Sequence, residues 1–334
     1  MEFGIKIPQG CLHEYGGWDP GRAWRRTADV ARRAEELGFH SVWVVDHLHA
    51  NPTAEHELTF ESFTTLAAVA ALTHRVRLGH LVICAGYRNP ALTAKMVTTL
   101  DVISGGRMTL GIGAGWKGDE ALAYGYDFPP LRERLAVLSE QLEVISAMLR
   151  PGRATYKGRY VAVDGAISEP KGLQQPRVPI LVGGNGPDVT WRIAARFADE
   201  LNLDGLTPDE FARAIPAVRE RCTEVGRDPA TLRVSVLLRG GQLAFDGERR
   251  IDLLGRYQEA GAHAVVGIPP GTVGDPDALD RLAADARAAG VPVRSAADPP
   301  TPSPDVHVPA DPDAALDQTL LQARRTIPQE ARDG

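Results

Sequence analysis

The amino-acid sequence predicts a (β/α)8 barrel, an α/β fold in which eight parallel strands are each followed by a helix. Short β-branched runs alternate with long amphipathic runs, and about 290 residues hold eight such units. Each amphipathic run is long enough to cross back over a parallel sheet, so the count favours a barrel over a doubly wound sheet. In a barrel, function is expected at the carboxyl ends of the strands, where the βα loops lie.

The first four units occupy residues 1–150. The first helix begins at Asp19-Pro20, which supply an N-cap and a proline at the first helical position, and it ends at Gly38. Asn89-Pro90 opens the third helix in the same way, and a long loop without helical spacing follows the fourth strand. The expected strands are 3–8, 41–45, 76–84 and 107–114, and the expected helices are 20–37, 60–73, 90–104 and 131–149.

The second half repeats the scheme. Thr207 and Glu210 form a capping box around Pro208, which opens a helix. The expected strands are 178–182, 200–203, 232–238 and 264–268, and the expected helices are 187–198, 208–225, 249–260 and 276–289. All eight units belong to one domain, residues 1–293.

Two segments fall outside the eight units. Residues 153–164 predict a β-hairpin inside an insertion at about 151–177. Residues 294–334 are rich in proline and aspartate and poor in aliphatic side chains, which predicts an extended tail that is disordered or draped over the surface.

Composition and charge exclude several classes of function. The 37 basic and 43 acidic residues give a net charge of −6, spread without a basic stripe, which argues against a nucleic-acid-binding surface. The apolar runs are far shorter than a membrane span and the first residues lack a secretion signal, so we expect a cytoplasmic protein that binds no membrane. Cys11, Cys84 and Cys222 are odd in number and widely spaced, which argues against a disulfide framework.

Asp46 and His47 end the second strand, directly after the apolar run VWVV, and so should lie side by side at the barrel mouth. The histidine can give or take a proton near neutral pH, and the aspartate can fix the ring or bind donor groups of a ligand. A structural role for Asp46 as a cap is the other reading. The further histidines of this loop, His49 and His56, do not imply a metal site, because the later strands supply no histidine ligands.

The third and fourth strands carry unusual small residues. Gly79 lies in mid-strand, which suggests a bulge or a close backbone approach to a ligand, and His80 after it is either a core residue or a pocket residue. The fourth strand ends in LGIGAGWKG, which formally matches a dinucleotide fingerprint but lacks its βαβ context. Small residues followed by Trp116 fit better with a flat ring that lies against the backbone.

The fifth strand ends in a glycine-rich turn, Gly183 to Gly186, and Pro187 then starts a helix. Free backbone N–H groups and the positive end of a helix together favour an anion, so this turn is a candidate phosphate site. A tight connection between strand and helix is the alternative interpretation.

These residues resemble the luciferase-like (bacterial luciferase superfamily) oxidoreductases, and within them the coenzyme F420-dependent branch. The resemblance covers most of residues 3–205, and the block 77–116 is long and specific. The resembling stretches are GIKIPQG, AEELGFHSVWVVDHL, RVRLGHLVICAGYRNPALTAKMVTTLDVISGGRMTLGIGAGWKGDE, FPPLRERL and PILVGGNG. The resemblance implies a (β/α)8 barrel that binds a flavin or an 8-hydroxy-5-deazaflavin at its carboxyl face.

The resemblance also implies roles for individual residues. Asp46 and His47 would touch the deazaflavin, with His47 as the proton shuttle, and a non-prolyl cis peptide would fall at or beside Leu81-Val82. The implied cofactor contacts are Asp46, Gly79, His80, Leu81, Val82, Ala114, Gly115 and Trp116 around the ring, and Gly183, Gly184, Asn185 and Gly186 around the phosphate. His80 replaces a commoner small hydroxyl residue, and Trp116 replaces a glutamate of the sugar-phosphate dehydrogenases, which argues against that substrate.

The function expected is hydride transfer between carbon 5 of F420 and a small organic substrate, with His47 as acid or base. An FMN-dependent monooxygenase that uses reduced flavin and oxygen is one alternative, and a non-catalytic flavin or deazaflavin carrier is another. A homodimer is left open. The expected substrate contacts are Gln9, His13, Tyr15, Trp18 and Trp116.

Overall fold

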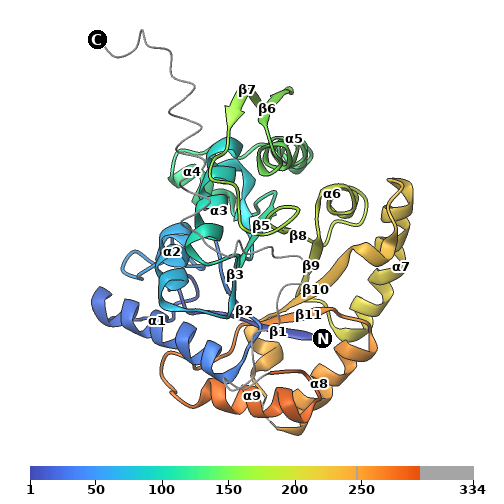
Figure 1. Cartoon of the computed structure of the whole chain (residues 1–334). Helices are drawn as coiled ribbons and strands as arrows, with labels where there is room; N and C mark the ends of the chain where they lie inside the picture. The colour runs from blue at the N-terminus through green and yellow to red at the C-terminus, as the bar shows by residue number, and fades with distance from the viewer. Residues whose placement is uncertain (246, 294–334) are drawn as a thin grey trace, which may run out of the picture.

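The computed structural model describes residues 1–245 and 247–293, and these residues form a (β/α)8 barrel (Figure 1). Eight parallel strands form the ring β3-β2-β1-β11-β10-β9-β8-β5, which closes because β5 pairs with β3. β4 lies outside the ring along β5. The strands are β1 Glu2–Lys6, β2 Ser41–Val44, β3 Arg77–His80, β4 Ile83–Cys84, β5 Met108–Gly113, β8 Ile180–Gly183, β9 Glu200–Asp204, β10 Arg233–Leu238 and β11 Ala264–Gly267.

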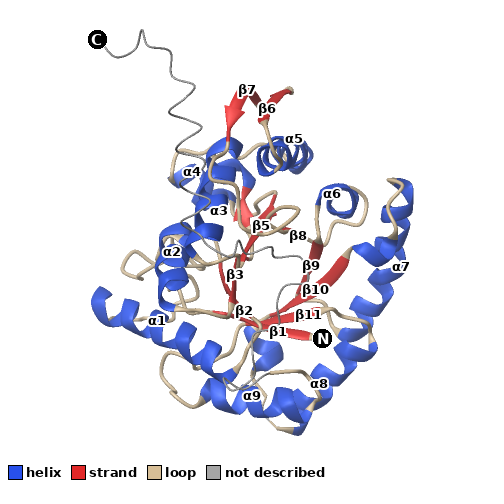
Figure 2. Cartoon of the chain, viewed as in Figure 1, coloured by secondary structure: helices blue, strands red, loops and turns tan. Residues whose placement is uncertain are grey.

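Helices surround the ring on its outside, and Figure 2 shows them in blue around the red strands. The predicted caps are confirmed: the Asp19 side chain accepts from the backbone N–H of Arg22, and Thr207 and Glu210 form the reciprocal capping box. The helices are α1 Pro20–Leu37, α2 Ser62–Leu72, α3 Pro90–Ile103, α4 Gly118–Ala123, α5 Leu131–Leu149, α6 Thr190–Phe197, α7 Pro208–Glu224, α8 Glu248–Glu259 and α9 Ala278–Ala288. Among the described residues, none of the helices is both long enough and apolar enough to cross a bilayer.

The structure departs from the predicted elements in three places. The expected strand 76–84 is divided into β3 and β4 by a non-prolyl cis peptide between Leu81 and Val82. The short helix α4 occupies part of the expected loop, because acidic residues follow its first residue and favour a helix start. α6 begins three residues later than predicted, because residues 187–189 form a turn.

The predicted hairpin is present beside α5. Strand β6 Arg153–Lys157 pairs antiparallel with β7 Ala162–Ile167, and the hairpin lies outside the barrel (Figure 1). The predicted tail, 294–334, lies outside the described residues, so its expected disorder and the domain boundary at 293 remain predictions.

One large side chain fills the barrel interior. Trp43 on β2 is buried, and its Nε1 donates to Oγ of Ser41 at 2.8 Å. Its register neighbour on β3 is Gly79, and a Cβ there would overlap the indole ring; a Cβ on Gly4 of β1 would lie 2.6 Å from Nε1. Gly79 therefore makes room for Trp43, which accounts for a glycine in mid-strand without a ligand; its contact with a cofactor remains a prediction.

We predict that Gly79→Ala lowers the free energy of unfolding by about 1–3 kcal/mol, because the added methyl overpacks the closed barrel against Trp43. Gly255→Ala in α8 is the matched control. Nothing lies within 4 Å of the Cβ it would add, so the better helix propensity of alanine should stabilise the protein by up to about 1 kcal/mol. Urea unfolding of both variants measures the difference. Equal stability of the two would show that the indole does not need this space.

Candidate functional site

His47 lies in the loop that follows β2, at the carboxyl end of the barrel. Its side chain is 19% exposed, and Nδ1 lies 3.1 Å from Oε2 of Glu120. The imidazole meets the ring of Trp116 edge to face, with centroids 5.5 Å apart. Nε2 has no hydrogen-bond partner in the part of the chain that the structure describes. The ring is thus held at one nitrogen and available at the other.

Glu120, on α4, anchors the histidine loop. Its side chain is only 1% exposed, and its carboxylate accepts from the backbone N–H of Leu48 at 2.9 Å and of His49 at 3.3 Å. The hydroxyl of Tyr87 donates to the same carboxylate at 3.0 Å. Burial alone would raise the pKa of the Glu120 carboxyl, but the hydrogen bonds from His47 and from the backbone outweigh it and lower that pKa. Burial next to this carboxylate raises the pKa of Tyr87.

Sequence reasoning missed Glu120 and Tyr87. Glu120 falls where a loop was expected, although Asp119 and Glu120 directly after Gly118 are a signal for the first turn of a helix. No local pattern distinguishes Tyr87, because its partner is distant in the chain.

Of the two interpretations left open for Asp46, the contacts in the structure favour the structural one. Its Oδ1 accepts from Oγ of Ser62 at 2.7 Å and from Arg88 at 2.9 Å, and its Oδ2 accepts from Arg88 at 2.6 Å and from the backbone N–H of Cys84 at 3.0 Å. These four bonds use the acceptor sites that a carboxylate offers. Asp46 therefore neither orients His47, which Glu120 holds instead, nor keeps an oxygen free for a cofactor.

Arg88 links the end of β2 to the start of α2. In addition to Asp46 it donates to Oε1 of Glu61 at 3.0 Å, and its guanidinium lies 4.8 Å from the ring centre of Phe63. Glu61 in turn caps α2 by accepting from the backbone N–H of Phe63 and Thr64. Asp46 and Arg88 thus form a buried structural ion pair, and Arg88 is a further residue that sequence reasoning did not single out.

His80 does not reach the barrel mouth. Alternation along β3 turns it away from Gly79, which faces the interior, and its ring lies 4.2 Å from that of Phe63 on α2. It is fully buried, and neither ring nitrogen has a partner among the described residues. Burial, together with the charge of Arg88, lowers the pKa of His80 to about 3, so the ring is neutral. Of the two readings left open for His80, the structure supports the core residue.

The cis peptide between Leu81 and Val82 agrees with the position that the resemblance implied. Leu81 packs on Trp43 inside the barrel, whereas Val82 is partly exposed. A Cβ on Gly113 or on Gly183 would lie 2.9 Å from a methyl carbon of Val82. The glycines at the ends of β5 and β8 therefore make room for the side chain of Val82, which presents an apolar surface at the mouth of the barrel.

The segment after β5 brings Trp116 over this region. Gly115 has φ +79°, and a Cβ there would lie 2.5 Å from Sγ of Cys84. Arg134 donates to the carbonyl oxygens of Ala114, at 3.4 Å, and of Gly115. Trp116 itself is 64% exposed, so it can contact a bound molecule.

The glycine-rich turn after β8 offers fewer N–H groups than expected. The N–H of Gly184 donates to the carbonyl oxygen of Asn202 at 3.0 Å, and the Asn185 side chain bridges to the backbone of Asp204. Within the described ranges, the backbone N–H groups of Asn185 and Gly186 have no acceptor. Of the predicted phosphate contacts in this turn, these two residues therefore keep a backbone N–H group available, and the anion site itself remains a prediction.

The remaining predicted contacts lie on the loop after β1. Gln9 is fully buried, and its amide bonds to the backbone of Val45 and Phe60. The hydroxyl of Tyr15 donates to the carbonyl oxygen of Pro8 at 3.0 Å. Both side chains support the fold and neither is open to a substrate. His13 is exposed, and Trp18 lies under the guanidinium of Arg22, 3.7 Å from its ring centre.

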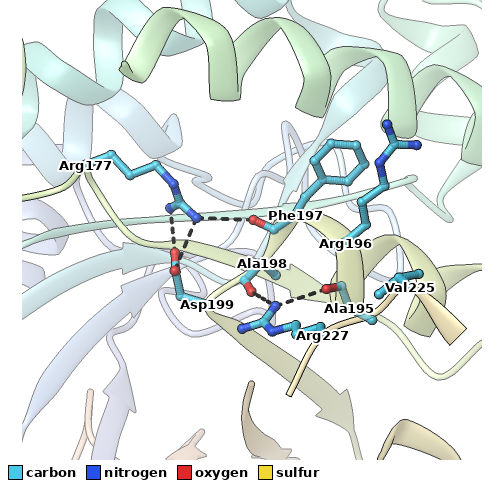
Figure 3. A pocket seen from close by; sticks show the side chains of 8 residues that line it. All are labelled: Arg177, Ala195, Arg196, Phe197, Ala198, Asp199, Val225 and Arg227. Atoms are coloured by element: carbon cyan, nitrogen blue, oxygen red, sulfur yellow. Dashed lines mark hydrogen bonds and ion pairs between the residues drawn. The ribbon is translucent and has the colours of Figure 1, made fainter. Parts of the chain in front are cut away.

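A cavity of about 290 Å³ lies at the opposite end of the barrel (Figure 3). Arg177 and Asp199, which precede β8 and β9, form an ion pair at 2.6 Å on its wall. Arg227 donates to the carbonyl oxygens of Ala195 and Ala198 at the end of α6. Both arginines thus have partners within the protein, and the cavity lies away from the carboxyl ends of the strands, where the candidate site residues are. Nowhere among the described residues do three or more histidine, cysteine, aspartate or glutamate side chains gather as a metal would require.

Comparison with known proteins finds a family and relatives that are similar to this chain in sequence. The sequence profile of the luciferase-like monooxygenase family matches residues 1–240. An uncharacterized protein of Mycobacterium tuberculosis is 31% identical over 274 residues, which cover 77% of this chain and 92% of that protein. The F420-dependent glucose-6-phosphate dehydrogenase of Kineococcus radiotolerans is 35% identical over 228 residues, 66% of this chain and 64% of that enzyme.

The fold is also similar to solved structures. One is an F420-dependent secondary alcohol dehydrogenase in complex with an F420-acetone adduct, which aligns with a TM-score of 0.73. The alignment covers 86% of this chain and 98% of that one at 22% sequence identity, so it supports the barrel fold and nothing finer.

We predict that Arg88→Met lowers the free energy of unfolding by about 3–5 kcal/mol, because it leaves the Asp46 carboxylate buried without its cation. Arg239→Met is the control: it breaks an ion pair with Asp204 whose arginine side chain is 67% exposed, and should cost at most about 1 kcal/mol. Denaturant unfolding of the two variants gives the comparison. A similar small loss in both would contradict the structural role of the Asp46–Arg88 pair.

Proposed function

The chain belongs to the luciferase-like monooxygenase family and is an enzyme, and from this premise we propose that it is an F420-dependent oxidoreductase. It would transfer a hydride between carbon 5 of the deazaflavin and a small organic substrate. The observation that carries the proposal is His47 at the carboxyl end of the barrel, held at Nδ1 by Glu120 and without a partner at Nε2 among the described residues. The relatives named as F420-dependent glucose-6-phosphate dehydrogenases support the choice of cofactor.

The residues at the mouth fit a flat ring that carries a phosphate. Val82 would lie against the ring, and Ala114 and Gly115 remain proposed contacts of the ring. The backbone N–H groups of Asn185 and Gly186 would bind the phosphate, close to Oγ1 of Thr190, which lies 2.7 Å from where a Gly186 Cβ would be. Gly183 and Gly184 shape this turn rather than donate to the anion.

The cofactor, when bound, supplies the carbon that takes or gives the hydride. The chain's own residues hold the ring, exclude water and move the proton. His47 would exchange the proton of a substrate hydroxyl at Nε2, since this nitrogen faces no protein acceptor or donor among the described residues. Trp116 would contact the substrate from above.

The charges around the site favour a neutral substrate. Arg88 is paired with Asp46, and Lys117 is buried with its ammonium 2.8 Å from Asp119. Neither cation is available for a substrate phosphate, so a small alcohol or carbonyl compound fits better than a sugar phosphate. His13 and Trp18 remain proposed substrate contacts, and the cytoplasmic location and the homodimer remain predictions.

An FMN-dependent monooxygenase is the second candidate, because the family is described by that reaction and FMN also presents a tricyclic ring and a phosphate. Binding separates the two. We predict that F420 quenches the fluorescence of Trp116 and binds at least about tenfold more tightly than FMN, a difference of about 1.4 kcal/mol. Titration of the protein with each cofactor measures both dissociation constants, and Trp116→Phe identifies the responding tryptophan. Tight binding of FMN without binding of F420 would replace the first proposal with the second.

We predict that His47→Ala keeps F420 binding within about tenfold but lowers turnover by about 10²–10⁴, because it removes a proton-transfer group and no phosphate contact. The measurement is the initial rate of F420 reduction with a panel of small secondary alcohols that starts from propan-2-ol. His49→Ala is the control, since its ring bonds only to the carbonyl oxygen of Ala50 and stacks on Tyr124. If His47→Ala turned over as fast as His49→Ala, His47 would be a packing residue.

A further inference from the structure

The Glu120 carboxylate is surrounded by hydrogen-bond donors. Two of them, the backbone N–H groups of Leu48 and His49, can only donate, and the Tyr87 hydroxyl lies 3.0 Å from Oε2. A protonated carboxyl group would turn one of its oxygens into a donor that faces another donor, so one of these hydrogen bonds would be lost. The lowered pKa of Glu120 agrees with an ionised group. The carboxylate is therefore an acceptor on every side.

This environment determines which nitrogen of His47 carries the hydrogen. An ionised carboxylate can only accept, so the contact of 3.1 Å to Nδ1 requires a hydrogen on that nitrogen. In the neutral ring, Nε2 then holds the lone pair. Nε2 is the nitrogen without a partner in the described chain, and the ring is still 19% exposed.

We infer that Glu120 is a positioning residue that selects the Nδ1–H tautomer of His47 and so prepares Nε2 as the proton acceptor. The inference rests on the proposed acid–base role of His47. As the substrate carbon loses its hydride to the cofactor, the hydroxyl proton passes to Nε2, and the alcohol is oxidised by two electrons to the carbonyl compound. Glu120 then faces an imidazolium and stabilises its charge; in the reverse direction the same proton returns to the carbonyl oxygen.

Glu120 also has a purely structural task, because it binds the backbone of the loop at two further points. Removal of its side chain would loosen the loop and lower activity for either reason. A useful variant must keep the loop and change only the tautomer. Glu120→Gln keeps the loop, since the amide oxygen still accepts from the backbone N–H groups of Leu48 and His49. An amide NH2 in place of Oε2 can only donate, to Nδ1 of His47 and to the Tyr87 hydroxyl, which then accepts instead of donating. The lone pair then moves to Nδ1, and Nε2 becomes protonated.

The experiment is heteronuclear NMR of the ring nitrogens of His47, in the cofactor-free protein at a pH where the ring is neutral. The His47 signals are assigned by their loss in His47→Ala. We expect a protonated Nδ1 and a bare Nε2 in the wild type, and the reverse in Glu120→Gln. With F420 and the alcohol substrate, kcat of Glu120→Gln should fall at least about a hundredfold, while KM and F420 binding change by less than about threefold.

Glu140→Gln is the matched control. Glu140 also accepts from three backbone N–H groups, those of Arg159, Tyr160 and Val161, but contacts no histidine among the residues that the structure describes. It should leave both the His47 tautomer and kcat unchanged.

The possible results separate the inference from the proposed function. A protonated Nε2 in the wild type overturns the inference, and this holds even if Glu120→Gln does not fold. An unchanged tautomer in folded Glu120→Gln overturns it as well. A reversed tautomer with unchanged kcat overturns the positioning role together with the acid–base role of His47. Absence of F420 binding overturns only the proposed cofactor, because the NMR experiment does not use it.

Discussion

Two buried carboxylates at the carboxyl end of β2 determine how the loops of this barrel mouth come together. Asp46 and Glu120 are almost completely removed from solvent, and a buried charge is tolerated only when donors or cations surround it. Their partners come from distant parts of the chain. Tyr87 and Arg88, adjacent in sequence, serve one carboxylate each, so the turn before α3 joins both. His47, which follows Asp46 in the chain, is held by Glu120 through Nδ1, and its Nε2 has no partner among the described residues.

The presence of glycines in the strands is explained by the packing of neighbouring side chains, without the approach of a ligand to the backbone. Trp43 occupies the interior between Gly4 and Gly79, and Val82 lies against glycines of β5 and β8. A barrel interior holds a limited volume, so a large side chain on one strand requires small residues on its neighbours. The same complementarity brings the apolar Val82 to the mouth, where an aliphatic side chain on β5 or β8 would displace it.

Local signals explain what the sequence could predict. Strand alternation, N-caps and the capping box act over a few residues, and they place most helices and strands within a few residues of their observed ends. The position of His47 follows from the end of a buried strand. The direction of the His80 side chain could also be predicted from the sequence, because strand alternation after the inward-facing Gly79 turns His80 toward α2. The partner of His47 could not be predicted. Glu120 lies 73 positions away in the chain, on a six-residue helix that is too short to show a hydrophobic periodicity.

The segment between β5 and α5 couples two parts of the site. Trp116 overhangs the mouth, Glu120 holds the histidine four residues later, and Arg134 fastens the start of the segment through the carbonyl oxygens of Ala114 and Gly115. A movement that opens Trp116 for a larger substrate would pull on the helix that carries Glu120. The hydrogen bonds from the backbone N–H groups of Leu48 and His49 to Glu120 oppose such a movement, because breaking either bond would leave a backbone donor unsatisfied. The position of Trp116 and the orientation of His47 thus depend on one short segment, residues 114–120.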